Sequence, residues 1–426
     1  MREAMRNILF VHQAMPGQFL HLARALAADR NNRVAFLTRP CPTHLAGVMK
    51  TEYKIRLAKG RPHPLLQNLA SGIAHGEAVA YALLTLQKQH DYIPDLIYAH
   101  PGWGETLYVK DILPHAPLIH YCEFFYHGLG ADTFFQPSEE ASMAELMKIR
   151  TKNAVNMLSL QACDLGVAPT QWQWRLHPEA YRPKIRVIHD GIDTKELRPD
   201  PNASFSLPNG VTLGREDDVV TYVNRSLEPC RGLYTFADAV AMIAKERPKC
   251  QFVVVGAEDG RYYGAHPPKG TTFKELATAR FGDAKGRVHF VGRLPRAQFV
   301  SLLQISSAHI YLSSPFVLSW SMLEAMAVGC LVVGSNTPPV TEIIVDGQNG
   351  LLADFFSPDE VAERVIEAMG APERMEHIRR AARETVLERY SLEDCLAEQL
   401  KLIDEVLSGS SFPPGAGMAG RIAALS

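Results

Sequence analysis

The sequence predicts an α/β protein made of two doubly wound parallel-sheet domains in tandem. Short, nearly continuous apolar runs alternate with helical patterns along the chain, as in parallel sheets that helices cover on both faces. This alternation breaks once, at residues 198–218, which hold three prolines and two glycines. A chain of 426 residues is also too long for one ordinary core, so more than one domain is expected.

The first domain is expected over residues 1–197, where strand and helix patterns alternate regularly. Each expected strand is a short apolar run bounded by polar or turn-forming residues. The expected strands are Asn7–His12, Arg33–Thr38, Asp95–Ala99, Pro117–Cys122, Asp164–Ala168 and Ile185–His189, and the main helical patterns are Gln18–Ala28, Ile73–Gln89 and Glu139–Gln161. The order of these patterns indicates a parallel sheet.

A second domain is expected over residues 219–391, after a linker at 198–218. Its expected strands are Val219–Asn224, Gln251–Gly256, Arg287–Val291, His309–Leu312 and Cys330–Gly334. Residues 392–426 are expected to form a last helix, Leu392–Leu407, and a loosely ordered tail rich in proline and glycine. Doubly wound sheets bind ligands at the carboxyl ends of their strands, so the two domains predict a binding cleft between them.

Composition excludes several classes of protein. A formal net charge of −2 gives no overall positive field, so nucleic acid is not an expected partner. The seven cysteines are scattered without a C-x-x-C pair, which indicates reduced thiols in a cytoplasmic protein. The charged start shows no signal peptide, and the long apolar stretch at 309–335 is too interrupted for a membrane span.

The first expected strand leads into a turn that suits a phosphate. Pro16 fits the first turn of a helix, and Gly17 lets a ligand approach the backbone closely before Gln18. A junction of strand, glycine and helix offers free N–H groups to an anion. A single glycine is also what any tight turn uses, and this is not the G-x-G-x-x-G fingerprint of dinucleotide sites.

The second domain opens with two arginines near the carboxyl end of its first expected strand. Arg225 lies just past that strand, and Arg231 precedes a glycine that opens the next helix. Two cations at this edge can neutralise a departing diphosphate without a metal ion. Two solvated surface arginines would give the same pattern, so the residues alone leave both interpretations open.

An apolar helix is expected from about Ser319, after a loop of serine and proline. It contains one acid, Glu324, and an acid in such surroundings must find polar partners. The two hydroxyls of a ribose are suitable donors. A neighbouring arginine is the alternative partner.

These segments resemble glycosyltransferase family 4. The resemblance lies in residues 324–333, Glu-Ala-Met-Ala-Val-Gly-Cys-Leu-Val-Val, together with 341–350, Thr-Glu-Ile-Ile-Val-Asp-Gly-Gln-Asn-Gly. Residues 187–193 resemble the strand and turn between the family's domains, and Arg225 with Arg231 matches the spacing of its Arg…Lys-Gly phosphate clamp. The similarity covers nearly all of the second domain and reaches the first domain through residues 16–19.

The resemblance implies the GT-B architecture, with two Rossmann-like domains facing across a cleft and the last helix crossing back toward the first domain. It also implies a retaining transferase that needs no divalent metal and no other cofactor. The nucleotide would lie mainly on the second domain, with Glu324 on the ribose and the two arginines on the diphosphate. The residues carried over for donor binding are Gly17, Gln18, Arg225, Arg231, Gly256, Arg293, Phe316, Val317, Leu318, Ser319 and Glu324.

Three positions depart from the family pattern. Phe316 stands eight residues before Glu324, where the family usually has a second glutamate, and Arg231 replaces the clamp lysine. Glu123 stands where a histidine often follows a strand of the first domain. We therefore expect the reacting centre at residues 119–128, with Glu123 positioning the donor sugar or acting as acid–base group, assisted by His120 or His127. An aromatic loop with capping polar residues is the alternative.

The leading hypothesis is a transferase that moves a sugar from a nucleotide-diphosphate donor, with UDP preferred over GDP. Its acceptor would be a glycan or lipid-linked glycan in surface polysaccharide biosynthesis, with peripheral contact at the inner face of the membrane left open. A catalytically weak, sugar-nucleotide-binding regulatory protein of the same fold is the alternative. The missing fingerprint disfavours an oxidoreductase, a phosphorylase activity stays open, and no histidine spacing indicates a metal site.

Overall fold

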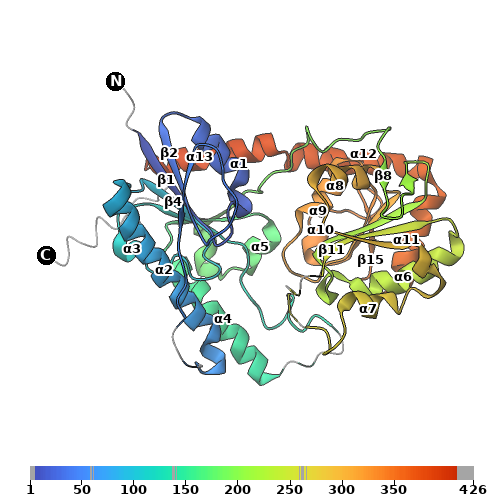
Figure 1. Ribbon diagram of the computed structural model, residues 1–426, viewed down its shortest axis with the longest axis horizontal. Coiled ribbons are helices and arrows are strands. Elements are labelled where there is room, and N and C mark those ends of the chain that lie inside the picture. The colour runs from blue at the N-terminus through green and yellow to red at the C-terminus, as the bar shows by residue number, and fades with distance from the viewer. Residues whose placement is uncertain are drawn as a thin grey trace. The chain divides into compact units, whose positions relative to one another are not determined.

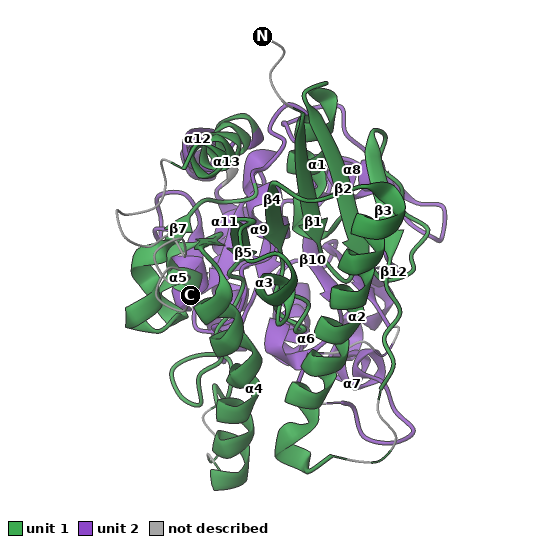
Figure 2. Cartoon of the chain, turned by 90° about the vertical axis from the view of Figure 1, so that its left-hand side faces the viewer, with its two compact units in different colours: residues 1–190, 393–426 green, residues 191–392 purple. Residues whose placement is uncertain are grey.

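The computed structural model describes residues 5–57, 60, 62–136, 140, 142–258, 260, 263–264 and 266–409. The chain divides into two compact units (Figure 2). The first comprises residues 1–190 and 393–426, and the second comprises residues 191–392. The second unit thus begins before the expected linker, and the last helix belongs to the first unit.

The first unit contains a parallel sheet of seven strands in the order β3-β2-β1-β4-β5-β6-β7. Figure 1 labels β1, β2 and β4 of this sheet. The strands are β1 (Arg6–Val11), β2 (Asn32–Thr38), β3 (Val48–Glu52), β4 (Leu96–Ala99), β5 (Leu118–Tyr121), β6 (Leu165–Ala168) and β7 (Ile185–Val187). The six strands that the sequence predicts here are confirmed to within a few residues at their ends. β3 was not predicted.

Helices cover both faces of this sheet. They are η1 (Gly17–Phe19), α1 (Leu20–Ala28), η2 (Pro64–Leu66), α2 (Gln67–His90), α3 (Val109–Ile112), α4 (Met143–Ala162), α5 (Gln171–Leu176), η3 (Glu179–Lys184) and α13 (Leu392–Leu407). Alternate residues of a strand point to opposite faces. Phe10 accordingly packs with residues of α1 and α13, whereas Leu9 packs with residues of α2. The sheet is therefore buried on both sides.

One helical stretch, Pro64–His90, is long and apolar enough to cross a membrane by length and composition alone. In the structure its side chains Val79, Leu83 and Leu86 are buried in the core cluster that also contains Leu9. A core helix passes the same test of length and composition. The packing identifies α2 as a helix of the first unit's core.

The second unit contains a parallel sheet of six strands in the order β12-β11-β10-β13-β14-β15. The strands are β10 (Val219–Ser226), β11 (Gln251–Ala257), β12 (Val288–Gly292), β13 (Ala308–Tyr311), β14 (Val332–Ser335) and β15 (Leu351–Ala353). The helices are η4 (Pro229–Arg231), α6 (Leu233–Glu246), α7 (Phe273–Thr278), η5 (Gly282–Arg287), α8 (Arg296–Ile305), α9 (Trp320–Ala327), α10 (Pro338–Thr341), α11 (Pro358–Gly370) and α12 (Pro372–Arg389). The five predicted strands are confirmed, and β15 is additional.

Residues 198–218 are structured differently from the linker that we expected. They contain a short antiparallel pair, β8 (Phe205–Ser206) and β9 (Thr212–Leu213). Phe205 and Leu213 are buried in the core cluster of the second unit. The prolines and glycines therefore shape a hairpin of the second unit. The predicted tail lies outside the described residues from position 410 on.

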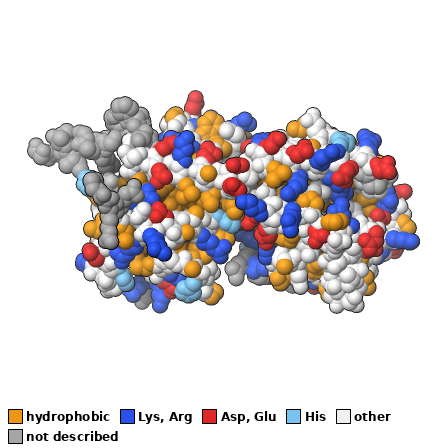
Figure 3. All heavy atoms as spheres, turned by 90° about the horizontal axis from the view of Figure 1, so that it is seen from above, with side chains coloured by type: hydrophobic (Ala, Val, Ile, Leu, Met, Phe, Trp, Pro, Cys, Tyr) orange, Lys and Arg blue, Asp and Glu red, His pale blue; other side chains and the backbone are white. Residues whose placement is uncertain are grey.

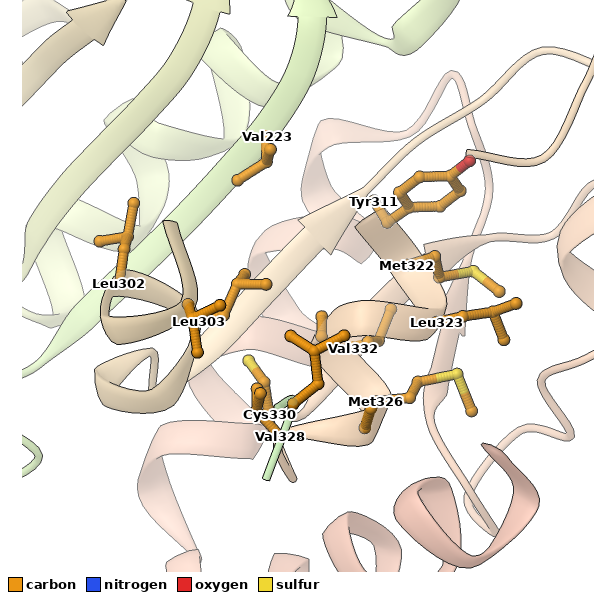
Figure 4. Packing of buried hydrophobic residues seen from close by; sticks show 14 of the residues in the cluster. Val223, Leu302, Leu303, Tyr311, Met322, Leu323, Met326, Val328, Cys330 and Val332 are labelled. Carbon is orange, nitrogen blue, oxygen red and sulfur yellow. The ribbon is translucent and has the colours of Figure 1, made fainter. Parts of the chain in front are cut away.

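The apolar helix predicted near Ser319 is α9, and it is built into the core of the second unit. Met322, Leu323 and Met326 have no exposed surface. Figure 4 shows these side chains beside Tyr311 of β13 and Val332 of β14. Burying three such side chains contributes several kcal/mol, about 1.5–3 kcal/mol each. This packing fixes the start of α9 relative to the end of β13.

The face of the molecule in Figure 3 carries side chains of both charges, interspersed with one another. No large area of one charge is visible on this face. The pattern agrees with the small net charge of −2.

We predict that Gly104→Ala strongly destabilises the first unit. Gly104 follows β4 with φ +101°, and a Cβ there would lie 2.3 Å from the carbonyl oxygen of Gly72 in α2. We expect a loss of about 2–4 kcal/mol in the free energy of unfolding, from the left-handed backbone and the clash together. Gly210→Ala is the matched control, because Gly210 has φ +86° but no atom within 4 Å of that position. Denaturant unfolding measures both, and equal losses would contradict the close contact.

Candidate functional site

The order of strands reverses once in each sheet, between β1 and β4 in the first unit and between β10 and β13 in the second. Loops that leave two such strands at their carboxyl ends run to opposite faces of the sheet, and ligands of doubly wound folds bind in the space between them. Each unit therefore has one edge where functional side chains are expected.

At the edge of the second unit, Arg231 connects the loops that follow β10 and β13. Its Nη1 donates to Ser313 Oγ at 2.7 Å and to the carbonyl oxygen of Val317 at 3.1 Å. Its own carbonyl oxygen accepts a hydrogen bond from the Tyr222 hydroxyl at 2.7 Å. Gly232 follows with φ +70°, and a Cβ there would lie 2.4 Å from Leu312 Cβ. The glycine thus lets η4 approach β13 closely, which places the guanidinium at the edge.

Phe316 lies against this cation. The Arg231 guanidinium carbon is 5.9 Å from the centre of the Phe316 ring, within the range of a cation–π contact. Phe316 also stacks on Tyr263, with 4.1 Å between the ring centroids. The backbone N–H of Tyr263 donates to the buried carboxylate of Glu228 at 2.6 Å. An aromatic pair thus occupies the position where the family usually has its first glutamate.

The remaining sequence-selected residues of the second unit follow neighbouring strands of the same sheet. Arg225 is exposed near the end of β10. Gly256 lies near the end of β11, and a Cβ there would be 2.7 Å from Leu227, so packing alone requires a small residue. Arg293 is exposed directly after β12. Parallel pairing therefore places all three at the edge that carries Arg231.

The loop before α9 is tied to β13. The backbone N–H of Ser319 donates to the Tyr311 hydroxyl at 2.7 Å, and its side chain accepts from the backbone N–H of Ser321 at 3.3 Å. Leu318 is buried, whereas Val317 presents its carbonyl oxygen to Arg231. The start of α9, with its positive dipole end, consequently lies near the Arg231 guanidinium.

Glu324 forms an ion pair with Arg296, the first residue of α8. Arg296 also pairs with Glu196 at 3.2 Å. Burial raises the pKa of Glu324, and the Arg296 guanidinium opposes that rise. In the structure, Glu324 therefore has a neighbouring arginine as its partner, which was the alternative to ribose hydroxyls in the sequence analysis. Binding of ribose hydroxyls by Glu324 stays a prediction.

At the edge of the first unit, Glu123 follows β5 and has a partner on each oxygen. Gln18 Nε2 donates to Glu123 Oε1 at 3.0 Å, and His100 Nε2 lies 3.3 Å from Glu123 Oε2. Gln173 Nε2 donates to the Glu123 carbonyl oxygen at 2.7 Å. These contacts join the loops after β1, β4 and β5. The carboxylate is held in place and remains about one third exposed, with a side-chain exposure of 30%.

His100 was not selected from the sequence, although it is the histidine paired with Glu123. It follows β4 and stacks on Trp103 at 4.7 Å between ring centroids. The only sequence signal is its place at a strand's carboxyl end, and many polar residues share such a place. The pairing with Glu123 becomes visible only once β4 and β5 are neighbours.

Gly17 lies against the ring of His12. Its φ is +52°, and a Cβ would lie 2.9 Å from two ring atoms of His12. His12 Nδ1 accepts the backbone N–H of Ala14 at 2.9 Å, and burial lowers the pKa of His12 to about 3. The ring is therefore neutral, and a glycine is required at position 17 for the turn to pass over it.

The two histidines selected beside Glu123 have different surroundings. His120 is buried within β5, and burial lowers its pKa to about 3. His127 Nε2 lies 2.7 Å from the carbonyl oxygen of Leu176, at the end of α5. His127 thus takes part in the attachment of its loop, whereas His120 is a neutral side chain beneath the sheet edge.

Comparisons with known proteins agree with this architecture. A model described as Glycosyl transferase family 4 group matches residues 30–197, and one described as Glycosyl transferases group 1 matches residues 209–385. Sucrose-phosphate synthase from Thermosynechococcus elongatus has a TM-score of 0.70 at 20% identity, covering 95% of this chain and 100% of its own. Anabaena HepE in complex with UDP-glucose has a TM-score of 0.64 at 19% identity, covering 93% and 99%.

The curated relatives match over shorter regions of the chain. Alpha-maltose-1-phosphate synthase of Mycolicibacterium smegmatis is 27% identical over 54% of this chain and 59% of its own length. Phosphatidyl-myo-inositol mannosyltransferase of the same organism is 24% identical over 63% and 72%. The chain thus spans about three fifths of the first relative. Together with the family models, these matches show that the chain belongs to glycosyltransferase family 4 and has the GT-B fold.

We predict that Glu105→Gln removes a pH-dependent loss of stability. Glu105 is buried in the loop that carries His100 and Trp103, and its carboxylate accepts the backbone N–H of Trp103 at 3.1 Å. Burial raises its pKa to about 7. The folded state thus holds a proton that the unfolded state has lost, so the stability of the wild type falls as the pH rises from about 4.5 to 7.

Glutamine keeps the acceptor without the charge. Relative to the wild type, Glu105→Gln should therefore gain about 3 kcal/mol in the free energy of unfolding between pH 4.5 and pH 8. Denaturant unfolding of both proteins across this range measures the difference, in which contributions from other groups cancel. A difference that stays constant with pH would show that Glu105 titrates normally.

Proposed function

We propose that the protein is a retaining, metal-independent glycosyltransferase that transfers a sugar from a nucleotide-diphosphate donor, with UDP preferred over GDP. The proposed acceptor is a carbohydrate or lipid-linked glycan in surface polysaccharide biosynthesis. The proposed location is the cytoplasm, with peripheral contact at the inner face of the membrane. The observation that carries the proposal is the Arg231 guanidinium, held between the loops after β10 and β13 at the point where the strand order reverses.

Arg231 suits a diphosphate because it is fixed and retains donors. Among the described residues, Nη1 donates to Ser313 and Val317, and the Tyr311 hydroxyl is a further hydrogen-bond partner of the side chain. A guanidinium carries five N–H donors, and those that remain are proposed to bind phosphate oxygens. The start of α9 adds a positive dipole end near the same place, and Arg225 supplies a second cation at the edge. Cations and dipoles fixed before the reaction stabilise the charge that develops on a leaving diphosphate.

The proposed chemistry needs no proton donor on the leaving group. As the glycosidic bond breaks through an oxocarbenium-like state, the diphosphate takes up the bonding electrons and Arg231 stabilises its charge. The acceptor hydroxyl attacks from the same face, and a donor phosphate oxygen takes its proton. Glu123 and His100 are proposed to position the donor sugar. Gln18 and His100 contact the two oxygens of the Glu123 carboxylate, so the orientation of that carboxylate is fixed.

Two relatives support the finer parts of the proposal. The complex of HepE with UDP-glucose supports a UDP-sugar donor, and the phosphatidyl-myo-inositol mannosyltransferase supports a lipid-linked acceptor. Glu324 already pairs with Arg296. To bind ribose hydroxyls, its carboxylate must either accept from the hydroxyls and Arg296 together or give up the ion pair with Arg296. The stacking of Phe316 on Tyr263 presents an apolar surface where a carboxylate usually lies, and it favours the weak sugar-nucleotide binder as the second candidate.

The first test is thermal stabilisation by nucleoside diphosphates in EDTA. UDP at 100 times its Kd should stabilise the folded protein by about 2.7 kcal/mol. Arg231→Met should weaken UDP binding about 10- to 100-fold, the value of one charge-assisted contact of about 1.5–3 kcal/mol. Arg280→Met is the matched control, since Arg280 pairs with Asp238 on the surface of the same unit. A metal requirement, or equal binding by both variants, would overturn the assignment.

The second test separates a transferase from a binder. The wild type should release UDP from a UDP-sugar, and Glu123→Gln should lower kcat about 100-fold or more while UDP binding is retained. Glu145→Gln, at an exposed position in the first turn of α4, is the control and should keep full activity. Tight UDP binding, without release of UDP from any UDP-sugar or of GDP from any GDP-sugar, would establish the regulatory binder instead.

A further inference from the structure

The ring of His100 is enclosed by the turn that follows it. It stacks on Trp103 at 4.7 Å and on Tyr121 at 5.7 Å between ring centroids, with interplanar angles of 29° and 28°. A Cβ at Gly102 would lie 2.7 Å from His100 Cε1, so a glycine is needed for the backbone to pass this close to the ring. These contacts hold the plane of the imidazole.

The same turn sets which ring nitrogen of His100 carries the hydrogen. The backbone N–H of Gly102 donates to His100 Nδ1 at 3.1 Å. An imidazole that accepts through Nδ1 carries its hydrogen on Nε2. His100 Nε2 lies 3.3 Å from Glu123 Oε2, so the ring donates to that carboxylate. The opposite tautomer would direct a ring N–H at the Gly102 N–H and a lone pair at the carboxylate.

Glu105 holds this turn in place. Its side chain has no exposed surface, and its Oε2 accepts the backbone N–H of Trp103 at 3.1 Å. That N–H is the next one along the chain after the N–H of Gly102. The hydroxyl of Tyr53, a buried residue directly after β3, donates to Glu105 Oε1 at 3.4 Å. The carboxylate therefore ties the turn to a second, separately anchored part of the first unit.

A similar arrangement follows β1. His12 Nδ1 accepts the backbone N–H of Ala14, two residues on, at 2.9 Å. The next backbone N–H, that of Met15, donates at 3.1 Å to Thr38 Oγ1, a buried hydroxyl at the end of β2. Each turn thus has a buried side-chain acceptor for the N–H that follows the one directed at the imidazole. Glu105 fills this place with an acid whose pKa is raised by burial to about 7, and acids perturbed in this way cluster at functional sites.

We propose that Glu105 is a positioning residue for the reacting centre. By holding the turn, Glu105 keeps His100 in the tautomer with hydrogen on Nε2, and this N–H fixes the Glu123 carboxylate. The inference rests on the proposed transferase function and adds a residue that acts on the reacting centre through others. All of these residues belong to the first unit.

Nuclear magnetic resonance of the full chain with ¹⁵N-labelled histidine reads the tautomer without any turnover. The ring resonances of His100, assigned through His100→Gln, should show hydrogen on Nε2 in the wild type. Glu105→Leu removes the acceptor of the Trp103 N–H and should lose most of this tautomer's signal. Glu105→Gln keeps an oxygen acceptor for that N–H and should restore the signal.

Leu86→Ala is the matched control for a general loss of stability. Leu86 is buried in the core of the first unit, ten residues along α2 from Gly76, which packs against the carbonyl of Gly104. Ten helical residues span about 15 Å, so the cavity lies away from the turn. Leu86→Ala should keep the wild-type tautomer of His100. A merely structural role for Glu105 predicts that Glu105→Leu behaves in the same way.

Release of UDP from a UDP-sugar tests the link to Glu123. Glu105→Leu should lower kcat about tenfold or more while UDP binding is retained, and Glu105→Gln should recover most of that loss. In a Glu123→Gln background, Glu105→Leu should lower kcat by less than about twofold, because substitutions that act through one group are not additive.

The outcomes separate this inference from the function on which it rests. The expected change of tautomer in Glu105→Leu supports the hold of Glu105 on His100 even if no UDP-sugar is turned over, in which case only the transferase function fails. A wild-type His100 ring that carries hydrogen on Nδ1 would overturn the inference, and this result needs no variant that folds. A wild-type tautomer in Glu105→Leu, or additive losses of kcat with Glu123→Gln, would overturn it as well.

Discussion

The parallel pairing of β10 with β13 is the constraint on which the position of Arg231, at the carboxyl edge of the second unit's sheet, depends. The two strands pair in register from Val220 with Ala308 to Tyr222 with Ile310, and their following loops meet although Arg231 and Ser313 are 82 residues apart. A guanidinium in a partly buried place is tolerated only with fixed partners, and Ser313 and Val317 provide them. Because α9 is packed into the core behind the loop, that cation has little freedom to move. The position of the Arg231 guanidinium therefore follows from the sheet.

In the first unit, the pairing of neighbouring strands fixes a carboxylate, that of Glu123, in place of a cation. Its central strands bring Gln18 and His100 to the two oxygens of Glu123, across 105 and 23 residues of sequence. One unit thus presents a fixed cation and the other a fixed carboxylate.

Much of the fold could be predicted from the sequence, because buried parallel strands are apolar throughout. The failures have local causes: β3 contains Lys50 and is half-exposed, and β15 has three residues. The sites were less predictable. Arg231 was selected from its place after a strand, whereas His100 and Arg296 were missed because their partners, Glu123 and Glu324, are reached only through tertiary packing. The composition of residues 198–218 predicts a linker, because turn residues indicate bends but do not show that Phe205 and Leu213 are buried in the core of the second unit.

A crystal structure of the protein with UDP tests the central claim most directly. We predict that the diphosphate lies at the carboxyl edge of the second unit's sheet, with its oxygens within hydrogen-bond distance of the Arg231 guanidinium and near the start of α9. We also predict that Nη1 keeps its bonds to Ser313 and Val317. A diphosphate bound away from Arg231, or bound there only through a metal ion, would contradict the account.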